Sequence, residues 1–295
     1  MAITLTQLRA FLAVTRAGGV HEAARHLYVS QPSVSAALAA LQRELGVALV
    51  ERRGRGIRLT AAGQSFAPYA AEVLGLLDQG RQAAHEAERP QLARIRVVAV
   101  NTAGEYLMPP ILQAYRQQEP RAEVLLEIVN RRAMLERVES RQADLGVGGR
   151  PFGRNLVGRP FLENELVVVG RAPVDDLAEA TWLLREEGSG TRAATEAFLE
   201  EEGIAPVETL TLGSNGAVKQ ALAIGLGVTL VSRHAVAREL AGGQLVEIPA
   251  PGTPVVRPWC THVRRGVEPR PAVQRFLDFV HSSAARQAIE QALSI

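Results

Sequence analysis

The stretch from Val20 to Leu45 constrains the fold of this chain most, because its pattern is typical of two short helices joined by a tight turn. Apolar residues recur every three to four positions in both halves, which predicts that each helix has one buried and one exposed face. The period breaks at Tyr28-Val29-Ser30. Ser30 is a suitable N-cap, and Pro32 stands in the first turn, where its missing N–H costs nothing. The pattern predicts a helix-turn-helix.

The second helix of this pair would expose short polar side chains, namely Gln31, Ser33, Ser35 and Gln42. Such side chains can bond base edges and phosphates in a major groove of DNA. Any surface helix pair also shows polar residues opposite an apolar stripe, so the pattern alone leaves a DNA-reading and a purely structural interpretation open.

The flanking sequence favours DNA. Leu5, Leu8, Phe11 and Leu12 predict a preceding helix, and VALVERRGRGIRLT after Gly46 predicts strand, turn and strand, which together make a winged helix. Four arginines in this hairpin, Arg52, Arg53, Arg55 and Arg58, place positive charge beside the polar helix, where a phosphate would lie. Residues 1–60 hold eight arginines against three acidic residues, a net charge of +5, which leaves −3 for residues 61–295. Only the first segment has the charge typical of a nucleic-acid-binding surface.

The runs LTQLRAFLAV and HEAARHLYVSQPSVSAALAALQRELGVALVERRGRGIRLTAAG resemble the amino-terminal domain of the LysR-type transcriptional regulators, and the resemblance extends over essentially all 295 residues. It implies that the second helix enters the major groove and that the wing flanks it. The DNA-contacting residues so implied are Gln31, Pro32, Ser33, Ser35, Arg52 and Arg53. The family often has a long side chain where this sequence has Ala36, so base recognition would depend more on the short polar residues.

A long helix is predicted from residue 61 to about residue 90, with Thr60 as its cap. From Phe66 onward its apolar residues keep a three-four spacing, which favours packing against a partner helix. The resemblance implies that this linker helix forms a dimer. Pro68 predicts a bend near Phe66 or a helix that is firm only after it, and Arg89-Pro90-Gln91 predicts the helix end and a domain boundary.

From Ile95 the pattern alternates between strands and helices, which predicts parallel sheets with ligand sites at the carboxyl ends of the strands. The resemblance implies an effector-binding domain over residues 91–295, with two α/β lobes similar to periplasmic binding proteins. Lobe I would comprise residues 91–163 and 267–295, and lobe II residues 164–266. The crossovers are expected near Phe161–Leu166 and Val263–Val267.

Three loops that open helices could bind a ligand, since helix amino termini offer free N–H groups and a positive dipole end. They are Asn101-Thr102-Ala103-Gly104, Gly188-Ser189-Gly190-Thr191-Arg192 and Gly213-Ser214-Asn215. Each loop alone is more typical of ordinary capping than of a ligand site, whereas three such loops at strand ends in facing lobes favour a site. The candidate effector-binding residues, several of them implied by the resemblance, are Asn101, Thr102, Asn130, Ser189, Thr191 and Asn215. Charged side chains are scarce in the loops, which favours an inorganic oxyanion, a small carboxylate or a phosphorylated metabolite over a large apolar ligand.

Other classes of function lack their motifs. The glycines around Ser189 do not complete G-x-S-x-G, and GVGGRPFG lacks the spacing of a dinucleotide loop, so no catalysis and no cofactor are expected. The single cysteine, Cys260, excludes an internal disulfide, and six scattered histidines predict no metal site. With no signal peptide and no 18-residue apolar run, a cytoplasmic location without a membrane is expected. These features also disfavour a transport-type binding protein, the alternative suggested by a two-lobed cleft.

The sequence therefore predicts a ligand-responsive, DNA-binding transcriptional regulator, and the resemblance implies a dimer paired as a tetramer. The ligand would be a small anion bound between the lobes. Neither the identity of this ligand nor the direction of regulation follows from the residues.

Overall fold

A computed structural model describes residues 2–54, 56–89, 94–150 and 155–293, and the chain divides into two compact units. The first comprises residues 1–84 with 140–142, and the second residues 85–139 and 143–295. The expected domain boundary near residue 90 falls at the edge of 90–93, which lie outside the described residues.

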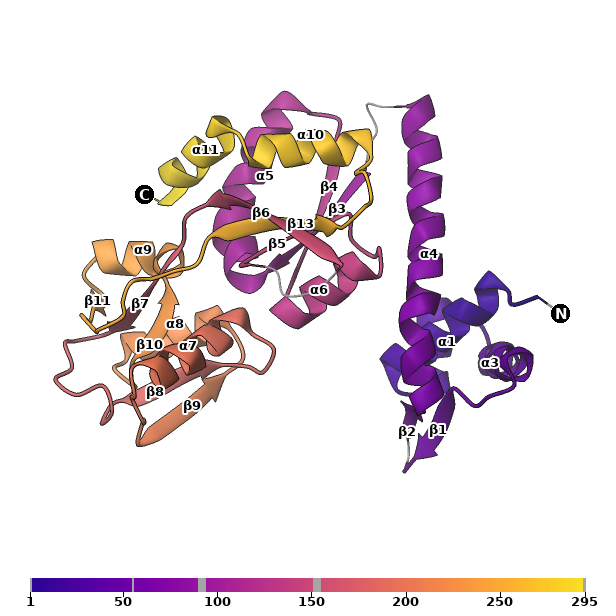
Figure 1. Cartoon of the computed structure of the whole chain (residues 1–295), viewed down its shortest axis with the longest axis horizontal. Coiled ribbons are helices and arrows are strands. Elements are labelled where there is room, and N and C mark those ends of the chain that lie inside the picture. The colour runs from indigo at the N-terminus through magenta and orange to yellow at the C-terminus, as the bar shows by residue number, and fades with distance from the viewer. Residues whose placement is uncertain (1, 55, 90–93, 151–154, 294–295) are drawn as a thin grey trace. The chain divides into compact units, whose positions relative to one another are not determined.

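The first unit is a winged helix-turn-helix (Figure 1). Its elements are α1 (Leu5–Ala17), α2 (Val20–Leu27), α3 (Gln31–Leu45), β1 (Val50–Arg53), β2 (Gly56–Leu59) and the start of α4 (Ala61–Glu88). The expected caps are present, since Ser30 Oγ accepts from Ser33 N at 3.3 Å and Thr60 Oγ1 accepts from Gly63 N at 3.0 Å. β1 and β2 pair antiparallel to form the wing.

The core of this unit is closed by the first turns of α4. Phe11 is fully buried, and its ring lies 5.7 Å from that of Phe66, centroid to centroid. Gly63 allows α4 to approach the wing, because a Cβ at this position would lie 1.9 Å from the carbonyl oxygen of Leu49. No side chain fits there without a backbone shift.

One expectation for this unit is wrong. Gln42 does not belong to an exposed reading face, because its side-chain oxygen accepts from the backbone N–H groups of Leu49 and Val50 at 2.8 and 3.2 Å and so holds the wing to α3. The linker helix α4 runs from Ala61 to Glu88 with Pro68 inside it, and the predicted bend near Phe66 stays a prediction. Burial of the first turns against the core offsets the lost hydrogen bond.

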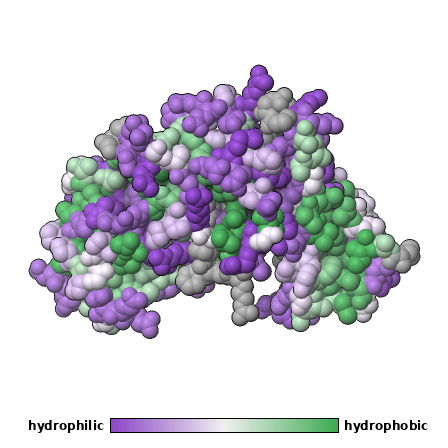
Figure 2. All heavy atoms as spheres, turned by 45° about the horizontal axis from the view of Figure 1, so that its top comes forward, coloured by the Kyte–Doolittle hydropathy of each residue, from purple (hydrophilic) through white to green (hydrophobic). Residues whose placement is uncertain are grey.

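Beyond these turns α4 exposes apolar side chains along its length. Tyr69, Val73, Leu76 and Leu77 are between 40% and 68% exposed. Figure 2 shows hydrophobic residues gathered on the visible face of this unit. Such a stripe is typical of a helix that packs against a second copy.

The second unit contains two α/β lobes, each a sheet covered on both faces. In lobe I the strand order is β4-β3-β5-β13-β6, with β3 parallel to β4 and β5 and with β13 antiparallel to β5 and β6. The strands are β3 (Arg94–Val100), β4 (Glu123–Val129), β5 (Leu145–Gly148), β6 (Leu156–Leu162) and β13 (Trp259–Arg264). Helices α5 (Met108–Gln118), α10 (Pro271–Val280) and α11 (Ser283–Leu293) cover one face and α6 (Arg131–Glu139) the other (Figure 1).

Lobe II is organised around β7, which pairs with β10, β11 and β12, while β8 and β9 form a parallel pair joined to β10 by a bridge between Trp182 and Val228. The strands are β7 (Glu165–Gly170), β8 (Thr181–Arg185), β9 (Glu208–Leu212), β10 (Thr229–Ser232), β11 (Val246–Glu247) and β12 (Val255–Val256). The helices are α7 (Gly190–Glu201), α8 (Asn215–Ala223) and α9 (Arg233–Ala241). The helix α9 was not expected from the sequence.

The chain crosses between the lobes twice. The first crossover, between β6 and β7, lies where it was expected. The second was expected near Val263–Val267 and lies instead at Arg257 and Pro258, because β13 from Trp259 onward pairs with β6 of lobe I. An extended stretch shows no sign in its sequence of which sheet it joins, and the boundary of lobe II at residue 266 was wrong for this reason.

Candidate functional site

A cavity of about 60 Å³ lies where carboxyl ends of strands from both lobes meet. Lobe I supplies Asn101 and Thr102 after β3, Asn130 after β4 and Arg150 after β5; lobe II supplies the segment after β8 and the last residue of β10. Parallel strands end at one edge of a sheet, so the loops that follow them converge there.

Five of the six residues predicted to bind an effector line this cavity, namely Asn101, Thr102, Asn130, Ser189 and Thr191. Two of them also cap helices, since Asn130 Oδ1 accepts from Ala133 N at 3.0 Å and Ser189 Oγ from Arg192 N at 3.4 Å. Capping and lining are compatible here, because the amino termini of α6 and α7 both open at the cavity.

Asn215 does not line the cavity. Its side-chain oxygen accepts from Arg185, and its Nδ2 donates to Thr102 Oγ1 at 3.3 Å and to Glu105 Oε2 at 2.9 Å. Thr102 and Glu105 belong to lobe I, whereas Asn215 begins α8 of lobe II. Asn215 therefore bridges the lobes behind the cavity wall.

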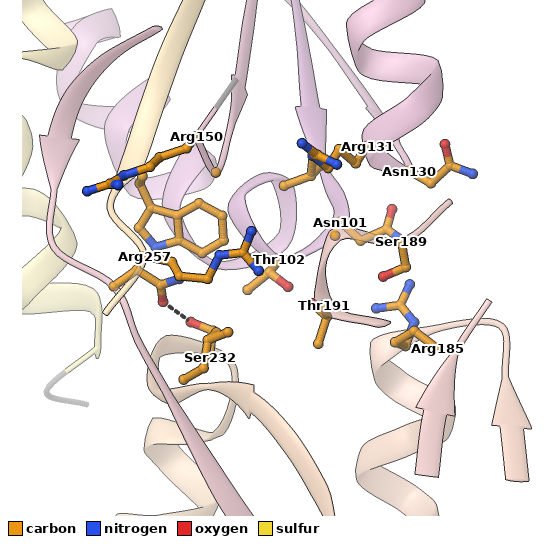
Figure 3. A pocket seen from close by; sticks show the side chains of 16 residues that line it. Asn101, Thr102, Asn130, Arg131, Arg150, Arg185, Ser189, Thr191, Ser232 and Arg257 are labelled. Atoms are coloured by element: carbon orange, nitrogen blue, oxygen red, sulfur yellow. Dashed lines mark hydrogen bonds between the residues drawn. The ribbon is translucent and has the colours of Figure 1, made fainter. Parts of the chain in front are cut away.

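The main feature missed from the sequence is a set of arginines. Arg131, Arg150, Arg185 and Arg257 all line the cavity, and none of the described lining residues is acidic. Figure 3 shows Arg150, Arg257 and Ser232 on one side of the cavity and Arg185, Ser189 and Thr191 on the other, with Arg131 between them. These four arginines lie outside the three predicted loops, in which charged side chains are scarce, so the positive charge of the cavity was not predicted from the sequence.

Three of these arginines follow a strand or end one, which is the signal that could have identified them. Arg131 comes two residues after β4, Arg150 two residues after β5, and Arg185 ends β8. Arg257 lies on a crossover, and no local pattern predicts its place.

Two of the arginine charges, those of Arg131 and Arg257, are held in an unfavourable setting. Burial lowers the pKa of Arg131, and the nearby guanidinium of Arg257 lowers it further. Burial also lowers the pKa of Arg257, Arg150 lowers it further, and Glu201 partly offsets this. Partly desolvated like charges favour an anion that neutralises them.

Polar contacts fix the crossover side of the cavity. Ser232 Oγ donates to Asn164 Oδ1 at 2.6 Å (Figure 3), and Trp259 Nε1 donates to His234 Nδ1 at 3.3 Å. Because Trp Nε1 can only donate, His234 Nδ1 acts as the acceptor, and burial lowers the pKa of His234 in agreement with a neutral ring. Asn164, Ser232 and Trp259 all line the cavity.

An outer cavity of about 590 Å³ shares Arg131 and Ser189 with the inner one. Its lining includes Arg132 and Glu136 of lobe I and Glu187, Arg192 and Glu196 of lobe II. Arginines and glutamates both line the outer cavity, so a preference for anions would come from the inner cavity, which arginines line.

The predicted DNA-contacting residues are all on the surface of the first unit. Gln31, Pro32, Ser33 and Ser35 are exposed at the start of α3, and Arg52 and Arg53 are exposed on β1. Ser33 Oγ lies 2.8 Å from Ser30 Oγ, and Arg58 of the wing pairs with Glu51. Arg55 lies outside the described residues.

Within the described ranges, no group of three or more potential metal ligands comes together, and no helix has the length and apolar character needed to span a membrane.

The chain matches two family descriptions. Residues 5–64 match "Bacterial regulatory helix-turn-helix protein, lysR family", and residues 89–285 match "LysR substrate binding domain".

Among individual proteins, it is 34% identical to the RuBisCO operon transcriptional regulator of Allochromatium vinosum, over 97% of this chain and 98% of that protein. It is 31% identical to the HTH-type transcriptional activator CmpR of Synechocystis, over 98% of both. A solved structure of the CcmR regulatory domain of Synechocystis PCC6803 in complex with 2-PG matches with 30% identity and a TM-score of 0.59, over 64% of this chain and 95% of that one.

Proposed function

The chain belongs to the lysR family of bacterial regulatory helix-turn-helix proteins, and we propose that it regulates transcription in response to a small anion bound between its two C-terminal lobes. It is a ligand-responsive, DNA-binding transcriptional regulator. We propose that it has no catalytic role, since its family consists of regulators.

The observation that carries the anion proposal is that four arginines line the cavity and that none of the described lining residues is acidic. One of the four, Arg185, is ion-paired with Glu186, which lies outside the lining. Guanidinium groups bind carboxylate and phosphate in bidentate geometry. The amino terminus of α7 adds N–H groups and the hydroxyls of Ser189 and Thr191 beside them. A phosphate, a carboxylate or a molecule with both groups fits this chemistry.

The size of the cavity limits the ligand. At about 60 Å³ it holds about five water-sized groups, since a water needs roughly 10–15 Å³ of such space. A compact metabolite of this size fills it, and a longer one would extend into the outer cavity past Arg131 and Ser189. The solved complex of CcmR with 2-PG makes 2-PG the first organic probe.

The proposed response depends on both lobes. Residues of lobe I, lobe II and the crossover at Arg257 all line the cavity, so an anion there bonds both lobes at once. It therefore stabilises the arrangement in which the lobes are close, and only such a difference in affinity between two states can shift their populations. In this proposal, the lobes of the DNA-bound oligomer are farther apart when no anion is bound.

DNA binding is proposed through α3 and the wing, with Gln31, Pro32, Ser33 and Ser35 at the groove and Arg52 and Arg53 at phosphates.

The exposed stripe of α4 supports a dimer, and a two-fold dimer reads two half-sites. We further propose pairing into a tetramer and a cytoplasmic location, where the chromosome is accessible. The domain limits proposed are residues 1–60, 61–90 and 91–295, with the second lobe ending at the crossover near Arg257.

The test is thermal unfolding of the full-length protein against 2-PG, phosphate, sulfate, sulfite, carboxylates and sugar phosphates. An anion present at a hundred times its dissociation constant stabilises the folded state by about 2.7 kcal/mol. Arg257→Met and Arg131→Met are expected to abolish this stabilisation. The matched control is Arg121→Met, because Arg121 is exposed in the turn before β4, at the opposite edge of the lobe I sheet.

A bound anion that stabilises the wild type and the two cavity variants equally would contradict the site. A panel without any stabilising anion would contradict the proposed ligand class, while leaving membership of the family untouched.

A further inference from the structure

The residue that ends α2 has an unusual backbone. Tyr28 has φ 55° and ψ 41°, in the left-handed region. Tyr28 N donates to Arg25 O at 3.2 Å, and Val29 N donates to Ala24 O at 3.1 Å. This pair of bonds closes a helix end in a way that usually requires glycine at the left-handed position.

The same unit provides an internal comparison. α1 ends at Gly18 with φ 67°, and α3 ends at Gly46 with φ 71°. Of the three helices α1 to α3, only α2 ends in a residue other than glycine in the left-handed conformation. A Cβ in this conformation carries a conformational cost that glycine avoids, so the side chain needs a compensating role.

Packing within the described chain does not supply that role. The Tyr28 side chain is 95% exposed, whereas the next most exposed large hydrophobic residue described, Val207, is 83% exposed. The apolar stripe expected at the dimer contact is on α4 and does not include Tyr28.

The position of Tyr28 in the chain indicates what it contacts. It lies two residues before Ser30, the N-cap of α3, and three before Gln31, so it belongs to the turn that leads into the DNA-reading helix. The neighbouring turn residue Val29 is also exposed, at 48%. The segment 1–60 carries a net charge of +5, which attracts the negatively charged phosphate backbone of DNA to this unit.

We propose, on the basis of the DNA interface proposed above for α3 and the wing, that Tyr28 binds the sugar–phosphate backbone of DNA beside the groove that α3 enters. Its hydroxyl donates a hydrogen bond to a phosphate oxygen, and its ring packs on the adjacent sugar. Tyrosine is one of the side chains that make such contacts, which fix register on the duplex without reading sequence. The side chain thus offsets in the complex the conformational cost that it imposes on the free protein.

The experiment compares Tyr28→Gly, Tyr28→Phe and Val47→Ala in the full-length protein. Val47 is the control, because it is exposed at 48% in the same unit but follows the carboxyl end of α3, away from the proposed groove and dimer contacts. Dissociation constants are measured on a duplex selected from random DNA by the wild-type protein and on an unselected duplex, and thermal unfolding is measured without DNA.

Tyr28→Gly is expected to unfold at or above the wild-type midpoint and yet to bind both duplexes at least about tenfold more weakly, as a lost hydrogen bond and lost packing imply. Tyr28→Phe keeps the ring and is expected to lose about two- to tenfold for the hydroxyl alone. Val47→Ala is expected to bind as the wild type does.

Three results would overturn the proposal. They are wild-type affinity of Tyr28→Gly, a loss of affinity that accompanies a lower unfolding midpoint, and a loss confined to the selected duplex, which would make Tyr28 a base reader. Failure of the wild type to select any duplex would count against DNA binding itself and is distinguishable from all three.

Discussion

In the second unit, Thr102 both lines the cavity and contacts the other lobe. It is 4% exposed, lines the cavity and accepts a hydrogen bond from Asn215 of the other lobe at 3.3 Å. An anion that bonds the Thr102 hydroxyl therefore also perturbs the contact between the lobes. We therefore propose that Thr102 links occupancy of the cavity to the arrangement of the lobes.

Thr102→Val keeps the shape of the side chain and removes this hydroxyl. The variant is expected to bind DNA with wild-type affinity and to lose the change in DNA binding caused by the stabilising anion, as measured by fluorescence anisotropy with and without it. Thr209→Val, on the exposed strand β9, is the control and should respond normally. A full response in Thr102→Val would reduce the residue to a structural role.

On the wing, Arg53 and Arg58 are both exposed, but Arg58 is paired with Glu51. Arg53→Ala is expected to weaken binding to selected and unselected DNA alike and to lower the slope of log affinity against log salt by about one unit, because one phosphate contact is lost. Arg58→Ala should change the slope less. An unchanged slope for Arg53→Ala would remove this residue from the interface.

Residues whose role depends on their immediate neighbours could be predicted from the sequence. Ser30 and Thr60 are caps, because capping involves groups only three residues away. Arg257 and Asn215 depend on residues far apart in the chain, so their positions could not be predicted. The small polar residues of the cavity were found and its charge was not, since the four arginines lie outside the three helix-opening loops from which the site was predicted.

At the scale of elements, the wing is positioned by α3 through Gln42, which bonds two backbone N–H groups at the start of β1. Removing the acceptor leaves two partly buried donors unpaired. Such a loss costs about 1–3 kcal/mol.

Gln42→Ala is therefore expected to lower the unfolding free energy of the N-terminal unit by about 1–3 kcal/mol, as followed by chemical denaturation. Gln31→Ala, exposed on the same helix, should leave stability unchanged and reduce discrimination between selected and unselected DNA by about 1–3 kcal/mol if a bidentate base contact is lost. Equal stability of the two variants would contradict the role assigned to Gln42.

The order of most strands and helices in the second unit followed from its hydrophobic pattern, because burial of each element sets its period. The expectation of parallel sheets holds for β3, β4 and β5 and is wrong for β7 and β13, which pair antiparallel with their neighbours. The crossover at Arg257 did not follow, because β12 and β13 are both short extended segments and only their pairing with β7 and with β6 tells them apart. The helix α9 directly follows β10, with Arg233 ion-paired to Glu165 and Glu247, and its short apolar pattern gave no clear period.

For the whole molecule, stability is expected to depend on pH through a buried histidine. His262 on β13 is fully buried, and burial lowers its pKa to about 4 from 6.5. The unfolded state takes up a proton first as pH falls, so the stabilisation is complete above pH 6.5 and is lost progressively towards pH 4. The shift corresponds to about 3 kcal/mol.

His262→Leu removes this titration. Between pH 6.5 and 4 its unfolding free energy is expected to fall less steeply than that of the wild type, while His26→Leu, exposed on α2, should leave the slope unchanged. Parallel pH profiles for His262→Leu and the wild type would show that His262 is not the group responsible.

The two units act as one regulator only if an anion in the arginine-lined cavity alters the complex on DNA. The most direct measurement is a nuclease footprint of the full-length protein on its selected duplex, with and without the stabilising anion. The footprint of the wild type is expected to change in length or pattern, and that of Arg257→Met to stay constant. An unchanged wild-type footprint with the cavity occupied, or the same change in Arg257→Met, would contradict the account.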